Sequence, residues 1–241
     1  MNLVLDFGNT RIKAGFFEGS QLLDAPVFQS EKELLENLDS IKNISHCLIG
    51  SVTNAHSNTS ELLAKKFNTQ VFKADTPIPL ENLYKSTLTL GSDRIAASVG
   101  AWSLHPNQNV LTIDAGTCIK YNFVNASNQY LGGAISPGIP MRLKAMNHYT
   151  VKLPLVETDK NYNKLTGQST QESLLSGALI GAVCEVEAMI SRYETEHENL
   201  VVYITGGDGD YLCKQVKNRF FAHPTLLLQG LNTILNYNLE K

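Results

Sequence analysis

The chain carries one short pattern twice, and this internal repeat constrains the fold more than any other feature. An apolar segment, an Asp-x-Gly turn and a second apolar segment occupy residues 3–17, and the same order returns in residues 111–123. β-Branched and aromatic residues bounded by turn residues are typical of strands. Each copy is therefore predicted to be a strand hairpin with an aspartate at its turn, Asp6 in the first copy and Asp114 in the second.

A helix and a further strand follow each hairpin in the same order. Leucine, valine and isoleucine recur at helical spacing in residues 31–38 and 172–193. Strands that run into small residues are predicted in residues 47–51 and 201–209. Because the elements recur in order, a duplicated α/β unit explains the chain better than a single domain with two hairpins that are alike by chance.

The boundary between the two halves is predicted in residues 105–109, a polar segment that contains a proline. A chain of 241 residues is long enough for one large domain or two ordinary ones. We therefore expect one domain in residues 1–108 and a second in residues 109–241.

The composition excludes several classes of protein. Hydrophobic residues make up 43% of the chain and charged residues 18%, as in a globular protein with a buried core. A net charge of -3 gives no electrostatic reason to expect binding to nucleic acid or to an anionic membrane. We expect no transmembrane helix, secretory leader or zinc site, and the four cysteines without a C-x-x-C pair favour a cytoplasmic location.

The two turns have the chemistry of a phosphate site. Gly8 and Gly116 have no Cβ, so backbone amides can approach an oxyanion closely. Short side-chain donors follow the glycines: Asn9, Thr10 and Thr117. Asp6 can hold Mg²⁺, which then bridges to a nucleotide phosphate. For one hairpin alone, an aspartate that caps its own turn is the simpler interpretation, but two such hairpins favour a nucleotide site.

Two cations, Arg11 and Lys13, lie just after the first turn. Side chains alternate in direction along a strand. If Asp6 points toward the ligand, we expect Lys13 to reach a phosphate only where the turn redirects it. Neither a P-loop nor a dinucleotide-binding fingerprint is present in the sequence.

The segment Asp6-x-Gly8-Asn9-Thr10-x-x-Lys13 resembles the first phosphate motif of the type III pantothenate kinases, a family of the acetate-and-sugar-kinase, chaperone and actin superfamily. Further segments resemble the family's other motifs in order along essentially the whole chain: the Gly-x-Asp-Arg motif at 91–94, the second phosphate motif at 113–117, the Gly-Gly-x-Ile-x-Pro-Gly loop at 132–138, Thr170 with Gly177, and the glycine pair at 206–207.

The resemblance implies an α/β chain with the duplicated, actin-like (ribonuclease H-like) two-lobed fold, whose mixed sheets are flanked by helices. It also implies ATP-dependent phosphorylation of pantothenate to 4′-phosphopantothenate, the first step toward coenzyme A. Mg²⁺ with ATP, a monovalent cation (K⁺ or NH₄⁺) and a homodimer belong to this expectation. A kinase of another small alcohol or sugar, and a non-catalytic ATP-binding regulatory protein of the same fold, are the alternatives.

The resemblance also assigns roles to individual residues of the two phosphate motifs. It implies that ATP contacts these positions: Asp6, Phe7, Gly8, Asn9, Thr10, Arg11, Ile12, Lys13 and Thr117. Asp114 corresponds to the ligand of the monovalent cation. Lys120 is a departure, because the family often has a hydroxyl residue there, and this leaves the detailed structure of the second loop open.

The acceptor site is expected around Asp93, the candidate general base for the primary alcohol of pantothenate. A local alternative is that Ser92 or Asp93 caps a helix at residues 95–102. Arg94 would bind the pantothenate carboxylate or orient Asp93. The implied substrate-binding residues are Tyr84, Gly91, Ser92, Asp93, Arg94 and Thr170. Local signals alone make Tyr84 a half-buried aromatic residue and Thr170 a helix N-cap.

Overall fold

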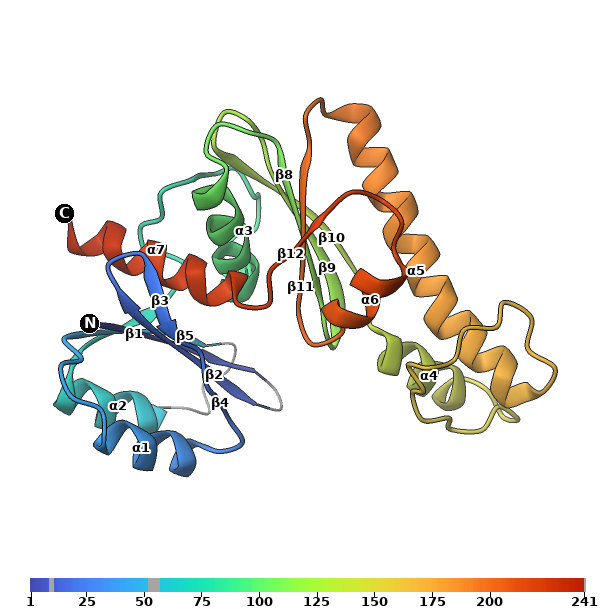
Figure 1. Ribbon diagram of the computed structural model, residues 1–241, viewed down its shortest axis with the longest axis horizontal. Helices are drawn as coiled ribbons and strands as arrows, with labels where there is room; N and C mark the ends of the chain where they lie inside the picture. The colour runs from blue at the N-terminus through green and yellow to red at the C-terminus, as the bar shows by residue number, and fades with distance from the viewer. Residues whose placement is uncertain (9–10, 52–56, 241) are drawn as a thin grey trace. The chain divides into compact units, whose positions relative to one another are not determined.

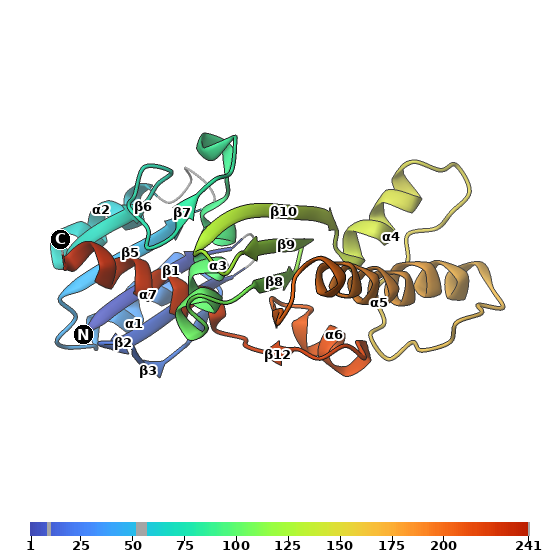
Figure 2. The same ribbon diagram turned by 90° about the horizontal axis from the view of Figure 1, so that it is seen from above.

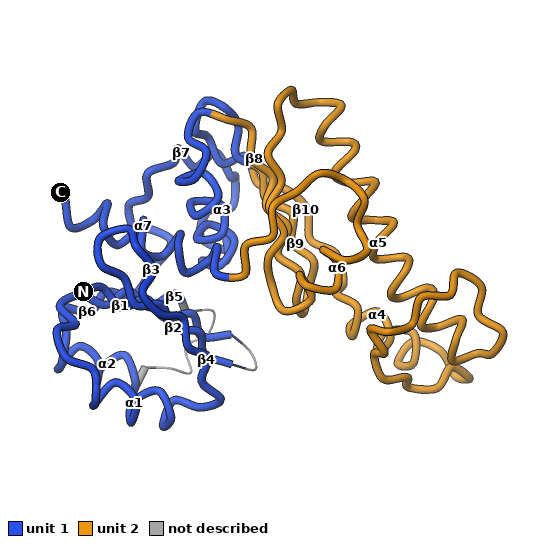
Figure 3. Tube along the Cα trace, in the orientation of Figure 1, with its two compact units in different colours: residues 1–107, 124–131, 225–241 blue, residues 108–123, 132–224 orange. Residues whose placement is uncertain are grey.

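The computed structural model describes residues 1–8, 11–51 and 57–240. It contains two compact units (Figure 3). The first comprises residues 1–107, 124–131 and 225–241, and the second comprises residues 108–123 and 132–224. The compact units are thus interleaved along the chain. The predicted division at residue 108 separates the two copies of the repeat, and it stays a prediction.

The first unit contains a mixed sheet. Its strands are β1 (Asn2–Phe7), β2 (Ile12–Glu18), β3 (Gln21–Asp24), β4 (Val27–Phe28), β5 (His46–Ser51) and β6 (Asn68–Phe72). The order across the sheet is β3-β2-β1-β5-β6, and β4 also pairs with β2. The β1–β2 pair is antiparallel, while β5 runs parallel to both β1 and β6.

The second sheet repeats this arrangement. Its strands are β7 (Glu81–Asn82), β8 (Val110–Ala115), β9 (Cys118–Val124), β10 (Gln129–Pro137), β11 (Val201–Thr205) and β12 (Phe221–Ala222). The order is β12-β11-β8-β9-β10-β7, and β8, β9 and β10 lie side by side in Figure 2. From β10 to β12 it matches the order from β3 to β6, element by element. The predicted duplication is therefore confirmed.

Two helix layers cover the first sheet, one on each face (Figure 1). Its helices are α1 (Glu31–Asp39), α2 (Ser57–Lys66), α3 (Ser92–Leu104) and α7 (Leu226–Leu239), with a 3₁₀ turn at Thr87–Thr89. Leu3, Leu5 and Phe7 enter the core formed with α1 and α2, whereas Val4 enters the core formed with α3 and α7. Asp6 shares the face of Val4, because side chains alternate along a strand.

Helices α3 and α7 approach each other at glycines. A Cβ on Gly230 would lie 1.7 Å from the carbonyl oxygen of Ala96, and one on Gly100 would lie 2.2 Å from that of Leu226. Such distances exclude a side chain, so each glycine is required for this close contact. The C-terminal helix thereby holds the first helical turns of α3, where the Gly-x-Asp-Arg motif lies.

Helix α5 (Thr170–Glu196) forms the main cover of the second sheet, with α4 (Ile139–His148) and α6 (Gly209–Gln215) nearby in the same core. By length and composition, α5 is the one helix among the described residues that could cross a membrane. Its apolar side chains, including Leu175, Leu179, Val186 and Ile190, are instead buried in the core with the strands. It therefore packs as a core helix.

Candidate active site

The two predicted aspartates occupy equivalent places near the ends of β1 and β8. Two residues after each aspartate, a glycine amide closes the turn: Gly8 donates to the carbonyl oxygen of Arg11 at 3.0 Å, and Gly116 donates to that of Cys118 at 2.9 Å. A hydrogen bond donated by a glycine amide thus closes the turn after both Asp6 and Asp114. Asn9 and Thr10, predicted to bind ATP, lie outside the described residues.

The β1–β2 register brings Asp6 directly opposite Lys13. Directly opposed residues of an antiparallel pair point to the same face of a sheet, so the lysine needs no redirection by the turn to share the face of Asp6. Phe7 and Ile12 are 2% and 6% exposed and belong to the core, so their side chains do not face a ligand. Their predicted contact with ATP would have to come from the backbone. Arg11 is exposed beside the turn.

In the second hairpin, Lys120 lies on Asp114. The Lys120 Nζ atom is 2.9 Å from Asp114 Oδ2, and the two side chains are only 24% and 16% exposed. The other carboxylate oxygen lies against Gly206, where a Cβ would be 2.6 Å from Asp114 Oδ1. Gly206 has φ +96°, a left-handed conformation that favours glycine. The carboxylate is thus enclosed by an ammonium group and a glycine backbone.

The 132–138 loop packs on the second phosphate turn. The amide of Gly138 donates to the carbonyl oxygen of Thr117 at 3.1 Å. A Cβ on Gly138 would lie 2.1 Å from the carbonyl oxygen of Gly116, so only glycine fits there. Thr117 itself is exposed, as a ligand contact requires. The loop therefore supports the backbone of this turn.

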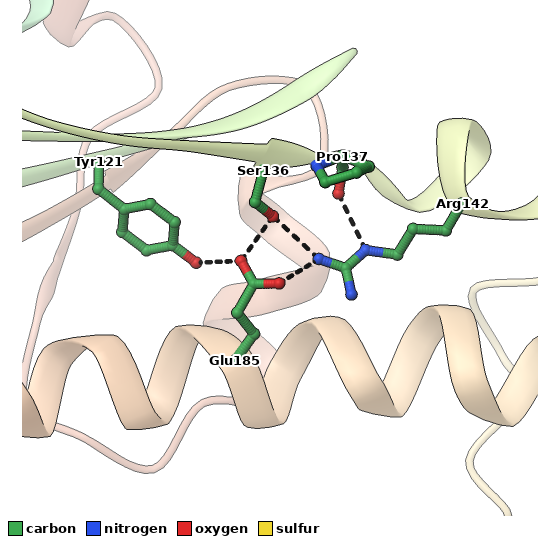
Figure 4. A network of polar contacts seen from close by, with 5 residues as sticks. All are labelled: Tyr121, Ser136, Pro137, Arg142 and Glu185. Atoms are coloured by element: carbon green, nitrogen blue, oxygen red, sulfur yellow. Dashed lines mark hydrogen bonds and ion pairs between the residues drawn. The ribbon is translucent and has the colours of Figure 1, made fainter. Parts of the chain in front are cut away.

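A polar network anchors the same loop to α5 (Figure 4). Tyr121 and Ser136 donate to Glu185 Oε1 at 2.9 and 2.6 Å, and Arg142 pairs with Oε2. Arg142 also donates to the carbonyl oxygen of Pro137 at 2.9 Å. Burial opposes ionisation of Glu185, but the hydrogen bonds from Ser136, Arg142 and Tyr121 outweigh it and lower the pKa of the carboxyl. Sequence reasoning missed this network, because its members are far apart in the chain.

Asp93 lies in the first turn of α3. The helix begins at Ser92, and Gly91 is its N-cap residue without a side-chain cap, so neither Ser92 nor Asp93 is the cap. Asp93 Oδ1 accepts from the Arg94 amide at 2.9 Å. A Cβ on Gly91 would be 2.5 Å from that oxygen, so a larger residue at 91 would displace the carboxylate. The glycine of the motif is therefore needed for the position of Asp93.

Arg94 is buried, at 5% exposure, and reaches Tyr84. Its Nη1 donates to the Tyr84 hydroxyl at 3.5 Å, and its Cζ lies 5.4 Å from the centre of the Tyr84 ring. The hydrogen bond and the positive charge of Arg94 lower the pKa of Tyr84. Two residues predicted separately for substrate binding are thus brought together.

A cavity of about 400 Å³ lies beside this segment, within the first unit. Gly91 and Ser92 line it, together with apolar residues that include Phe72, Ile78 and Leu90. The lining is about equally polar and apolar, since Lys73 and Asn82 also belong to it, and a hollow in which polar groups converge among apolar ones is a common form of small-molecule site. The Gly-x-Asp-Arg motif is therefore adjacent to space for a ligand.

Thr170 is the first residue of α5 rather than its cap. Ser169 is the N-cap, and its side chain accepts from the Glu172 amide. The interpretation of Thr170 as an N-cap is thus wrong by one residue, and its exposed position leaves its predicted substrate contact as a prediction. Among the residues that the structure describes, no group of three or more His, Cys, Asp or Glu side chains could hold a metal ion by itself.

Comparison with known sequences identifies the family. The family model for type III pantothenate kinases matches residues 2–192. A type III pantothenate kinase of Christiangramia forsetii is 41% identical, with 99% of both chains covered. A type III pantothenate kinase of Flavobacterium johnsoniae is 37% identical, with 100% of this chain and 99% of that protein covered.

Solved structures agree on the fold. A putative Baf family transcriptional activator from Campylobacter jejuni has a TM-score of 0.62 at 20% identity, covering 99% of this chain and all of that one. A ROK family glucokinase from Streptomyces griseus, solved with glucose and AMPPNP, has a TM-score of 0.52 at 12% identity, covering 100% of this chain and 99% of that one. The fold is thus actin-like, with mixed sheets flanked by helices, as predicted. With the family match over most of its length and these full-length relatives, the chain belongs to the type III pantothenate kinase family.

Proposed function

We propose that this chain transfers the γ-phosphoryl group of ATP to the primary alcohol of pantothenate, forming 4′-phosphopantothenate in the first step of coenzyme A synthesis. The observation that carries the proposal is the Gly-x-Asp-Arg segment at the start of α3. There Asp93 directly follows Gly91 and Ser92, which line a cavity of about 400 Å³, and its carboxylate accepts a hydrogen bond from the Arg94 amide. The family membership of the chain supports the same reaction.

Asp93 acts as the general base in this proposal. A kinase contributes mainly positioning and charge neutralisation, and a carboxylate accepts the proton of the attacking hydroxyl. The hydrogen bond from the Arg94 amide orients the carboxylate of Asp93. Thr170, which is exposed at the start of α5, is proposed as a substrate contact from the family resemblance.

Arg94 presents a fixed positive charge to the carboxylate of pantothenate. Its burial and its contact with Tyr84 hold the guanidinium in one place, and a planar guanidinium matches a carboxylate. The apolar residues of the cavity, among them Ile78 and Leu90, suit the uncharged middle of the substrate. Asp93 and Arg94 do not line the cavity themselves, but they lie in the chain between Ser92 and Ile95, which do.

ATP is proposed to bind at residues 6–13 and at Thr117. The amides of Gly8 and Gly116 already donate within their turns, so the proposal rests on Lys13, which shares the strand face of Asp6. Mg²⁺ arrives with the nucleotide and neutralises phosphate charge. Asp6, which is 9% exposed at the end of β1, is the residue that would hold this ion through its carboxylate.

A monovalent cation such as K⁺ or NH₄⁺ at Asp114, which family resemblance implies, fits the residues of this chain poorly. One carboxylate oxygen is 2.9 Å from Lys120 Nζ, and the other lies against Gly206. A free ion would have to displace an ammonium group that the chain already holds there. We therefore derive no step of the reaction through such an ion.

The enzyme is proposed to be a soluble, cytoplasmic homodimer. On α5, Gly177 is exposed and Gly181 is partly exposed, and an added Cβ on either would meet no described atom of this chain within 4 Å. The two glycines are four residues apart and share one face of the helix, and no part of the described chain packs closely on either. Size-exclusion chromatography with light scattering tests the dimer directly.

A coupled assay across a panel of small alcohols tests the proposed reaction. With ATP and Mg²⁺, we expect turnover with pantothenate and a phosphorylated product identified by mass spectrometry. Turnover with a sugar but not with pantothenate would replace the substrate assignment. ATP binding without turnover of any alcohol would favour a regulatory protein, the class named for the Campylobacter jejuni neighbour.

A further inference from the structure

We propose that the Lys120 ammonium is a built-in replacement for a monovalent cation at the second phosphate loop, so that catalysis by this enzyme does not depend on K⁺ or NH₄⁺. The inference rests on the proposed function for its activity measurements. It starts from the ion pair between Lys120 Nζ and Asp114 Oδ2 at 2.9 Å.

The lysine is held where a counterion is needed. Its neighbours on β9, Ile119 and Tyr121, are 2% and 1% exposed, so the strand that carries Lys120 is anchored in the core on both sides. The ammonium group and the Asp114 carboxylate are both largely shielded from water. A charge in this setting is screened less than one in solution. The position of the ammonium group is therefore set by the fold.

Asp114 needs such a partner because it lies next to an anion site. It precedes the turn at Gly116 and Thr117, the proposed phosphate contact, by two and three residues. An unneutralised carboxylate there would repel the phosphates of ATP. A lysine ammonium has the same unit charge as K⁺ and, like NH₄⁺, donates N–H hydrogen bonds. A tethered group also needs no cation from solution, because its effective concentration is set by the chain.

The first hairpin supports the same interpretation. There Lys13 lies directly opposite Asp6 in the β1–β2 register. With Lys120 on Asp114, each copy of the duplicated hairpin presents a lysine on the strand that follows its aspartate. Lys120 therefore stands to Asp114 as Lys13 stands to Asp6, on the strand that follows the aspartate.

A second lysine near this loop offers a matched control. Lys160 pairs with Asp208 at 2.6 Å and contacts the carbonyl oxygen of Gly207 at 3.5 Å. The amide of Asp208 in turn donates to the carbonyl oxygen of Ala115. Replacement of Lys160 by alanine therefore removes an ion pair from the same region without uncovering Asp114.

The first experiment measures pantothenate phosphorylation with choline as the sole monovalent cation, and then with K⁺ or NH₄⁺ added. We expect less than about twofold activation of the wild-type enzyme and of Lys160→Ala. Lys120→Ser should lose about tenfold or more in choline, since a buried carboxylate loses its charge partner, and K⁺ or NH₄⁺ should restore most of the rate. A wild-type enzyme that requires K⁺, or a Lys120→Ser enzyme with full activity in choline, would overturn the proposal.

The second experiment does not depend on turnover. An ion that binds only the folded protein raises its Tm. We expect K⁺ to raise the Tm of Lys120→Ser above the value in choline, with no such specific effect on the wild type or on Lys160→Ala. An equal K⁺ effect on the wild type, or none on Lys120→Ser, would contradict the inference. If the wild type phosphorylates no pantothenate under any condition, the proposed function fails, and this measurement still tests Lys120.

Discussion

In the first hairpin, Asp6 is buried at the end of β1 and lies opposite Lys13, within a unit that also holds Asp93, Arg94 and the cavity. In the second hairpin, Asp114 contacts Lys120 and the backbone of Gly206. Both turns close through a glycine amide. The glycine hydrogen bond is therefore common to both copies, although the second turn is shorter, and the groups around each aspartate differ.

The difference shows how a duplicated element acquires unequal roles. The first hairpin belongs to the unit that contains the cavity, and the proposed function assigns its aspartate to the metal that accompanies ATP. The second is supported by the 132–138 loop and by the network of Glu185, and the proposed function assigns it a phosphate contact. The proposed base, Asp93, belongs to neither hairpin.

The largest expected effect tests whether the chemistry lies outside both hairpins. Asp93→Asn should lower kcat about 10²-fold or more, because an amide cannot accept the hydroxyl proton, while ATP binding persists. Asp210→Asn is the matched control, since Asp210 also lies in the first turn of a helix. For both variants, steady-state kinetics measure kcat and a separate titration measures nucleotide binding. A nearly normal kcat would remove Asp93 from the role of base.

The next test compares the two aspartates directly. Asp6→Asn should lower kcat/KM on the order of tenfold and raise the Mg²⁺ concentration needed, because a ligand of the nucleotide's metal is lost. Asp114→Asn should have a smaller effect, since Lys120 still places a positive charge at the loop. Reaction rates measured across a Mg²⁺ titration distinguish Asp6→Asn from Asp114→Asn. If both variants raise the required Mg²⁺ concentration equally, the two hairpins share one role.

The third test concerns the enclosure of Asp114. Gly206→Ala should destabilise the fold by about 1–3 kcal/mol, because a side chain is strained at a left-handed backbone position. Its Cβ would also lie 2.2 Å from the carbonyl oxygen of Ala115. Gly207→Ala is the control, since a Cβ there meets no atom within 4 Å. Equal free energies of unfolding by urea denaturation would show that Gly206 is not required.

The smallest expected effect concerns the support of the second loop. Glu185→Gln should destabilise the fold by about 1 kcal/mol at neutral pH, because its hydrogen bonds lose a charged acceptor. Since the folded state lowers the pKa of Glu185, its stabilisation is present above the ordinary value near 4.3 and is lost as the pH falls through the lowered value. The difference in the free energy of unfolding between the wild type and Glu185→Gln should therefore become smaller at acidic pH. If this difference in the free energy of unfolding stays constant from pH 7 to pH 3, ionisation of Glu185 does not contribute to the stability of the fold.

Local patterns in the sequence were sufficient for much of the fold. The apolar segments at residues 3–17 and 111–123 became the hairpins β1–β2 and β8–β9, and the helical spacing near residues 31–38 and 172–193 became α1 and α5. These predictions succeed because strand and helix periods are properties of neighbouring residues. Helix starts were less certain: Ser169, not Thr170, is the cap of α5.

The order of the motifs also determined the family and the residues of the candidate site. Tyr84, Gly91, Asp93 and Arg94 could be named from the sequence, but only the tertiary structure decided that Arg94 is buried against Tyr84 and that a cavity lies beside Gly91. Likewise, Lys120 stood out in the sequence as a departure, and only the tertiary structure showed its contact with Asp114. Such contacts depend on strand register and on packing between distant segments, which no local pattern encodes.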